Sequence, residues 1–118
     1  MRKLIIVFCL LMASQAHAGK ANVIAAKVFA EAGETFRFEV TILSDDTGWG
    51  KYADRWEVLA PDGTVLGTRI LAHPHETEQP FTRDLSGVKI PGSITKVQVR
   101  AHDSVEGFGG EVFAVTLP

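Results

Sequence analysis

The chain has 118 residues, with 12 lysines and arginines against 14 aspartates and glutamates. Residues 1–18 hold two of the cations and none of the acids, so the remaining 118 − 18 = 100 residues carry a formal charge of 10 − 14 = −4. A mildly acidic surface excludes nucleic acid or anionic lipid as the main partner, because both require a dense cationic footprint. The length fits one domain.

The N-terminal segment, residues 1–18, predicts a secretory signal peptide. Two basic residues precede an apolar run at 4–12, and the triplet Ala-His-Ala at 16–18 has the A-x-A form of a cleavage site. The run is too short to span a bilayer as a permanent anchor. We therefore expect a periplasmic or secreted chain, residues 19–118, that begins at Gly19 and has no membrane anchor after cleavage.

Cys9 is the only cysteine, and it lies inside the apolar run. It does not follow a small-residue motif in the way that a lipidated cysteine does, so we expect neither a lipid nor a disulfide. Disulfides are common in exported domains, because the compartment is oxidising and small cores are marginally stable. The domain is therefore expected to be held together by packing alone.

Short runs of alternating apolar and polar residues recur along the mature chain, and no long segment has helical periodicity. Turn signals separate the runs, above all Pro61-Asp62-Gly63 and Ile90-Pro91-Gly92. The pattern predicts an all-β, immunoglobulin-like antiparallel sandwich of about seven strands. The expected strands lie at 23–31, 36–42, 56–60, 65–71, 81–85, 94–101 and 113–117.

Two stretches within residues 56–110, WEVLAPDGTVLGTRI and LSGVKIPGSITKVQVRAHDSVEGFGG, carry a family resemblance. They resemble the second half of a fibronectin type III domain, although the tyrosine of that family's E–F corner is absent and Ile94 stands near its place. The chain is also similar to small secreted bacterial proteins with a His-Pro-His…Gln-Pro-Phe-Thr-Arg stretch. These resemblances imply a fibronectin-III-like sandwich, whereas a fold by itself supplies no function.

In an antiparallel meander, alternate connections lie at opposite ends of the sandwich. One end, here called the loop end, should collect residues 44–54, 73–80 and 102–110, which hold every histidine of the mature chain. The opposite end receives the two short turns. Loops at one end of a sandwich commonly carry recognition, so we expect any functional site at the loop end.

Histidines make this end a candidate metal site. His73 and His75 have i, i+2 spacing, which places both rings on one side of an extended strand. Joined by His102 and a carboxylate such as Asp103 or Glu76, they would suit Zn²⁺ or Cu²⁺. Two other interpretations remain open. The histidines could fix turns through hydrogen bonds, or they could contact a small molecule or a peptide.

Aromatic residues of the same loops, Trp49, Tyr52 and Phe108, are candidates for a binding surface, whereas Trp56 is expected in the core. Arg83 has the parity of the apolar strand positions around it, so we expect it to form a structural ion pair with a carboxylate such as Asp54 or one across the sheet.

Other chemistries fit the loops less well. Asp45, Asp46 and Asp54 lack the rhythm of a calcium loop. No helix follows the glycines at 107–110 to bind phosphate, and Ser104 beside its neighbouring histidine is not a catalytic triad.

These features predict an exported β-sandwich that acts as a binding or interaction module, contacting a protein or a small ligand at its loop end. The sharper hypothesis places a transition metal there. One alternative is a structural component of a secreted or periplasmic assembly, pairing through an exposed edge strand. Another is a small metal-dependent hydrolase with Glu76 as base. Short loops on a domain of this size leave little room for a catalytic cleft, so we expect no enzyme and identify no catalytic residue.

Overall fold

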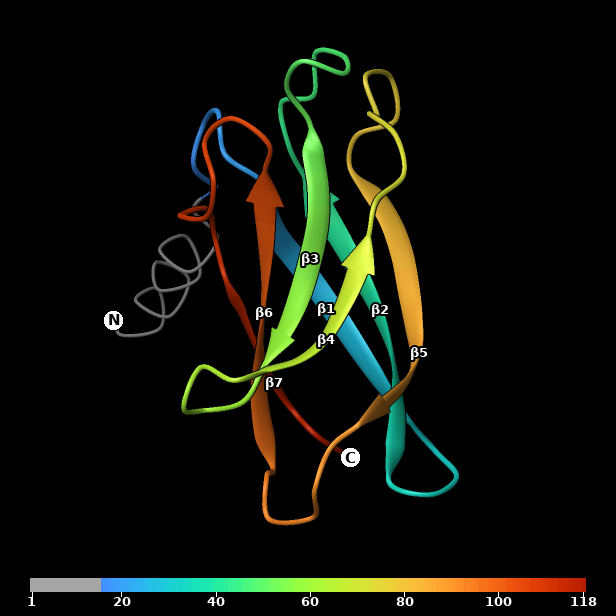
Figure 1. Cartoon of the computed structure of the whole chain (residues 1–118). Helices are drawn as coiled ribbons and strands as arrows, with labels where there is room; N and C mark the ends of the chain where they lie inside the picture. Colours follow the sequence, from blue (N-terminus) through green and yellow to red (C-terminus); the bar gives the residue numbers. More distant parts are fainter. Residues whose placement is uncertain (1–15) are drawn as a thin grey trace, which may run out of the picture.

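The computed structural model describes residues 16–118, so the expected signal peptide lies largely outside the described residues. The described part is all-β, with seven strands (Figure 1). They are β1 (Asn22–Glu31), β2 (Thr35–Leu43), β3 (Ala53–Leu59), β4 (Val65–Ile70), β5 (Phe81–Lys89), β6 (Lys96–Asp103) and β7 (Phe113–Thr116). No helix in residues 16–118 is long and apolar enough to cross a membrane.

Two antiparallel sheets form a sandwich, which confirms the predicted fold class. One sheet has the order β1-β2-β5, and the other has the order β4-β3-β6-β7. All paired strands are antiparallel. Strands that follow one another in the chain therefore run in opposite directions, and the connections alternate between the two ends (Figure 1).

Inward-facing residues of both sheets form the core, as the period-two pattern predicts. Phe38, Val40 and Ile42 alternate along β2 and are completely buried. Trp56 and Val58 of β3 are also completely buried, which confirms the expected core position of that tryptophan. These side chains interleave between the sheets, so burial of apolar surface holds the two layers together.

Strand β5 continues four residues beyond its expected end because it contains a bulge. Phe36 pairs with Val88 and Phe38 pairs with Leu85, so an extra residue of β5 is accommodated between these pairs. Gly87 lies there with φ +72°, a left-handed conformation that glycine adopts without steric cost. The strand that was expected to end at residue 85 therefore continues through this bulge to Lys89.

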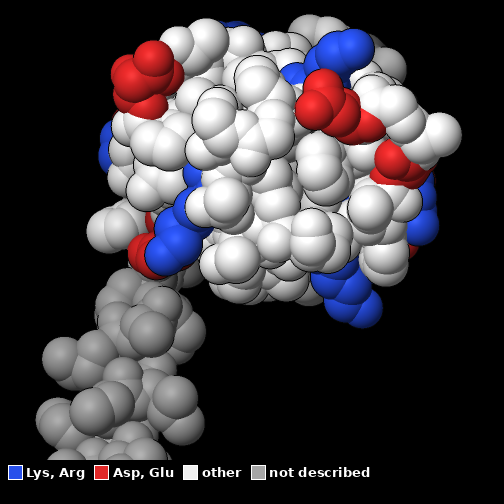
Figure 2. Space-filling view, turned by 90° about the horizontal axis from the view of Figure 1, so that it is seen from below, with Lys and Arg blue, Asp and Glu red and all other residues white. Residues whose placement is uncertain are grey.

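The end opposite the loop end is built from short turns. In the hairpin between β3 and β4, Ala60 N donates to Thr64 O at 2.8 Å, and Gly63 has φ +91°. Figure 2 looks onto this end, and its middle shows no lysine, arginine, aspartate or glutamate. Glu34 and Asp62 lie in these turns, whereas most charged residues of the connections belong to the loop end.

Candidate functional site

The three long connections meet at the loop end, as the alternation of strands predicts (Figure 1). Tyr52 and Ser104 join the first to the third: Tyr52 N donates to Ser104 Oγ at 3.0 Å, and Ser104 N donates to Tyr52 O at 2.8 Å. Ser44 and Gln79 join the first to the second, since Ser44 N donates to Gln79 Oε1 at 2.9 Å. The connections thus form one continuous surface.

Asp46 fastens two of these connections. Its Oδ1 accepts hydrogen bonds from Ser44 Oγ at 2.7 Å and Ala53 N at 3.0 Å, and its Oδ2 accepts one from His75 N at 2.8 Å. A carboxylate bonded in this way satisfies backbone donors that the loops would otherwise leave unpaired. Asp46 therefore has a structural role.

His75 points inward and is only 5% exposed. Its ring stacks on Phe81 with centroids 3.9 Å apart and an interplanar angle of 8°. Arg83 Nη2 lies 3.0 Å from His75 Nε2, and a guanidinium can only donate, so Nε2 accepts. The proton of the neutral ring is then on Nδ1, which is buried and has no hydrogen-bond partner among the described residues. Burial and the charge of Arg83 lower the pKa of His75.

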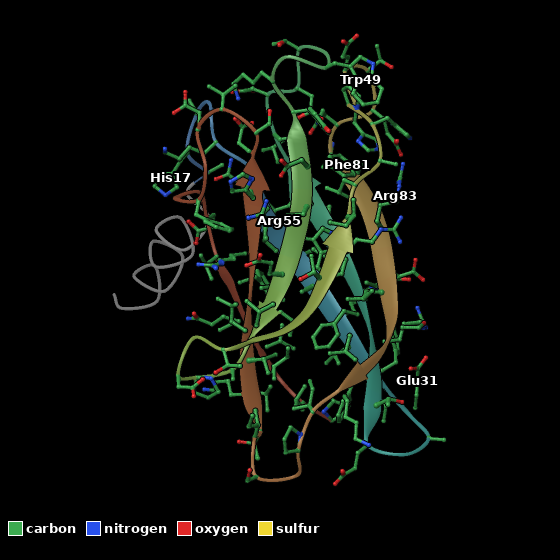
Figure 3. The ribbon with its side chains drawn as sticks, viewed as in Figure 1. His17, Glu31, Trp49, Arg55, Phe81 and Arg83 are labelled. Carbon is green, nitrogen blue, oxygen red and sulfur yellow. The ribbon has the colours of Figure 1, made fainter. Side chains whose placement is uncertain are left out.

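Arg83 forms an ion pair, but with a different carboxylate from the one expected. Its Nη2 lies 3.1 Å from Glu78 Oε1, so the partner comes from the adjoining connection and not from Asp54 or across the sheet. Glu78 lies only five residues before Arg83, at the end of the connection that leads into β5, and its carboxylate therefore reaches the arginine. Figure 3 shows Arg83 next to Phe81 at the start of β5.

His73 lies beside His75 as expected from the spacing, with ring centroids 4.6 Å apart. Its Nδ1 is 3.0 Å from Pro74 O, which as a carbonyl can only accept. His102 lies elsewhere, on the outer side of β6. Its Nδ1 is 2.8 Å from Asp54 Oδ1, and its ring meets Phe108 edge-on at 4.7 Å.

The structure does not support the metal-site hypothesis. No group of three or more histidine, cysteine, aspartate or glutamate side chains that could hold a metal occurs in residues 16–118. His75 turns inward, where its Nε2 is occupied by Arg83, while His102 turns outward to an aspartate. The i, i+2 spacing correctly predicted that the rings of His73 and His75 lie close together. It gave no information on the side of the sheet from which His102 projects.

Asp103, another expected ligand, is fully buried and serves the fold. Lys51 Nζ lies 2.8 Å from its Oδ1, and the N–H groups of Val105 and Glu106 donate to its Oδ2 at 3.0 and 2.8 Å. Burial alone would raise the pKa of Asp103, but the bonds from Lys51 and these two N–H groups outweigh it, so the pKa is lowered. The aspartate remains ionised and anchors the third connection.

A charged network on the outer face of β3 and β6 was not predicted. Glu57 lies between two arginines, with Arg55 Nε at 3.1 Å and Arg100 Nη2 at 2.9 Å from its oxygens. The Phe108 ring lies 3.8 Å from Arg100 Cζ. Burial acts to raise the pKa of Glu57, and the two arginines more than compensate, so the pKa is lowered. Strand alternation could have placed Glu57 and Arg100 on the outer face, but their meeting depends on the register that pairs these two residues.

The expected aromatic surface is divided in two. Phe108 belongs to the network on the sheet face, whereas Trp49 and Tyr52 pack edge to face at the tip of the molecule, with centroids 5.6 Å apart and an angle of 73°. Trp49 is 69% exposed. Figure 3 shows it beside the 71–80 connection.

A depression lies between the first and second connections, with a volume of about 360 Å³. It is lined by Trp49, His73, Pro74, Glu76 and Thr77. In residues 16–118, the Glu76 carboxylate has no ion-pair or hydrogen-bond partner, and the Nε2 atom of His73 has none either. This tip depression therefore combines an exposed indole with unoccupied polar groups, and it includes three of the residues predicted for the site, Trp49, His73 and Glu76.

Comparison with known proteins identifies a relative of the chain. The chain is 40% identical over 96 residues, 81% of its length, to a protein of Halomicrobium mukohataei described as "Putative lipoprotein". The alignment spans 47% of that relative, so the chain corresponds to about half of it. No protein-family model matches the chain, and no solved structure matches it significantly.

Proposed function

We propose that the protein is an exported binding module that holds a small ligand, or a peptide segment of a partner protein, in the tip depression. The observation that carries this proposal is the exposed Trp49 beside Glu76 and His73 on connections that are hydrogen-bonded to one another. Sandwich domains commonly bind through loops gathered at one end. The arrangement of three and four strands also supports the fibronectin-III-like interpretation.

The chemistry of the depression suits recognition. An indole supplies a large apolar surface at a low cost in side-chain entropy, and a few polar groups beside it orient a ligand. Glu76 can accept hydrogen bonds or face a cation, and His73 offers its Nε2 atom. The Cβ of any residue replacing Gly48 would lie 3.0 Å from Glu76 Oε2, so the absence of a side chain there leaves room for the carboxylate.

We also propose an extracytoplasmic location. The basic residues, apolar run and A-x-A triplet of residues 1–18 support export, and the description of the relative as a lipoprotein agrees with it. We propose binding and not catalysis, because several polar side chains at this end already form hydrogen bonds or ion pairs that hold the loops together. Asp46, Asp103 and His75 all have such partners.

The proposal can be tested by nuclear magnetic resonance, because one of the two tryptophans, Trp49, is exposed and the other, Trp56, is buried. A ¹⁵N-labelled sample would be titrated with a library of monosaccharides, small amines and short peptides. Binding at the tip depression should shift the indole N–H signal of Trp49 and the amide signals around His73 and Glu76. The buried Trp56 indole serves as an internal control, since it should not move.

Trp49→Ala and Glu76→Gln should weaken binding of any probe found in this way. Lys96→Gln, a change on the far part of β6, is the matched control and should leave binding unchanged. Shifts confined to the outer face of β3 and β6, or a library without any probe that moves the Trp49 signal, would contradict the proposed site.

A further inference from the structure

The backbone of Gly19 is held on both sides at the loop end. Gly19 N donates to Asp45 Oδ2 at 2.7 Å, and Gly19 O accepts from Lys51 Nζ, also at 2.7 Å. Lys51 is itself held by the buried Asp103. Gly19 is also the residue that directly follows the expected cleavage site, so the first residue of the mature chain is already fixed in place.

Residues on the two sides of this point differ in burial. Residues 16–18 are exposed, whereas Ala21 is 1% exposed and β1 begins at Asn22. The side chain of Asn22 bonds to His17, and it also bonds to Lys20 O, Leu43 O and Glu111 N. Loss of residues 16–18 would therefore remove only part of the bonds that hold the start of β1.

We propose that removal of the leader creates an α-ammonium group at Gly19 that pairs with Asp45 and fastens β1 to the first connection. A leader-removing endopeptidase hydrolyses the Ala18–Gly19 bond. The hydroxyl of water goes to the carbonyl carbon of Ala18 and its hydrogen to the nitrogen of Gly19, which takes a further proton from solvent. The hydrogen bond to Asp45 then becomes charge-assisted, and such bonds are stronger than those between neutral groups.

The charges around Gly19 allow this pairing. In residues 16–118, Asp45 has no cationic side-chain partner, so its carboxylate is available. The nearby cations are occupied: Lys51 lies 2.8 Å from Asp103, and Lys20 lies 3.6 Å from Glu106. His17, which faces Glu111 at 3.8 Å, leaves with the leader. The new ammonium group would therefore lie beside the Asp45 carboxylate, which has no cationic side-chain partner in residues 16–118.

The inference rests on the export part of the proposed function and not on the tip depression. A first test maps the N-terminus: the full chain is expressed in a bacterium, and the exported product is examined by intact mass and N-terminal sequencing. We expect Gly19 as the first residue. A product that begins at any other residue, or that retains the leader, would overturn the inference without bearing on ligand binding.

A second test measures the ion pair. All seven strands lie within residues 22–116, so a chain that begins at Gly19 retains the whole sandwich. Asp45→Asn should lower the melting temperature of this chain by about 2–4 °C, the size expected for an exposed ion pair. In a chain that begins at Ala16, where Gly19 N is an amide, the same change should have little effect.

Asp46→Asn provides the matched control, because Asp46 bonds to the loops and not to Gly19. It should lower the melting temperature of both chains by similar amounts. An Asp45→Asn effect of equal size in the two chains would show that the ammonium contributes nothing, and the inference would then be wrong.

Discussion

Arg83 donates a hydrogen bond of 3.0 Å to Nε2 of His75, and this contact defines His75 as a neutral, buried acceptor. A protonated ring could not accept this bond, and it would place a charge next to Arg83. The other groups around it are His73, Glu78 and Asp46, of which the two acids favour protonation. Burial and Arg83 prevail, so the pKa of His75 in the folded chain lies below its ordinary value of 6.5.

We therefore predict that acid destabilises the fold through His75. The unfolded chain takes up the proton more readily, so the stabilisation is fully present above pH 6.5 and is lost as the pH falls through the lowered value. Urea unfolding between about pH 7.5 and about pH 5 measures this slope. His75→Gln should flatten it, while His73→Gln, at an exposed position, should have a much smaller effect because burial and Arg83 are the larger causes of the lowered pKa. An unchanged slope in His75→Gln would refute the assignment.

Truncation of the two tryptophans should change the free energy of unfolding by very different amounts. Trp56→Ala empties the centre of the core and should cost about 3–5 kcal/mol in the free energy of unfolding. Trp49→Ala removes an exposed side chain and should change it by less than about 0.5 kcal/mol. Chemical denaturation of both variants checks this difference. A large loss of stability in Trp49→Ala would mean that its ring supports the loops and is not available to a ligand.

Lys51 compensates the buried charge of Asp103, so its removal should be costly. Lys51→Met leaves an ionised carboxylate buried without its cation, and we expect a loss of about 2–3 kcal/mol. Lys51→Arg should retain most of the stability. The control is Lys20→Met, which breaks the more exposed pair with Glu106 and should cost at most about 1 kcal/mol. Equal losses in the two Met variants would argue against the special role of Lys51.

Arg100 and Phe108 should be energetically coupled on the outer face of the sheet. The guanidinium carbon lies 3.8 Å from the centre of the ring. A double-mutant cycle with Arg100→Met and Phe108→Leu should give a coupling of about 0.5–1 kcal/mol. The same cycle with Arg55, which lies 5.3 Å from this ring, should give a smaller value. A coupling of zero for Arg100 would indicate that the contact contributes nothing to stability.

Much of the fold could be predicted because burial in a strand is a local, period-two property. Phe38, Val40 and Ile42 alternate with polar residues, and so do Trp56 and Val58, and all five are in the core. The gathering of the connections at one end then followed from antiparallel order alone. The bulge at Gly87 could not be predicted in this way, because it depends on the pairing of β5 with β2.

The candidate site was predicted in part. Trp49, His73 and Glu76 line one depression at the expected end. The convergence of the histidines failed because His75 packs inward and His102 projects outward, and these directions depend on tertiary contacts with Phe81 and Asp54. The network of Glu57 and its arginines requires the register of two strands, which short-range patterns do not specify.

The three hydrogen bonds accepted by Asp46 have a thermodynamic consequence for binding. Loops that are tied to one another before a ligand arrives lose little conformational entropy when it binds, so a larger part of the contact energy becomes affinity. Asp46→Asn should therefore weaken the binding of a ligand that does not contact residue 46, mainly through a less favourable entropy of binding. The rigidity of this end would then be as much a determinant of recognition as the side chains that line it.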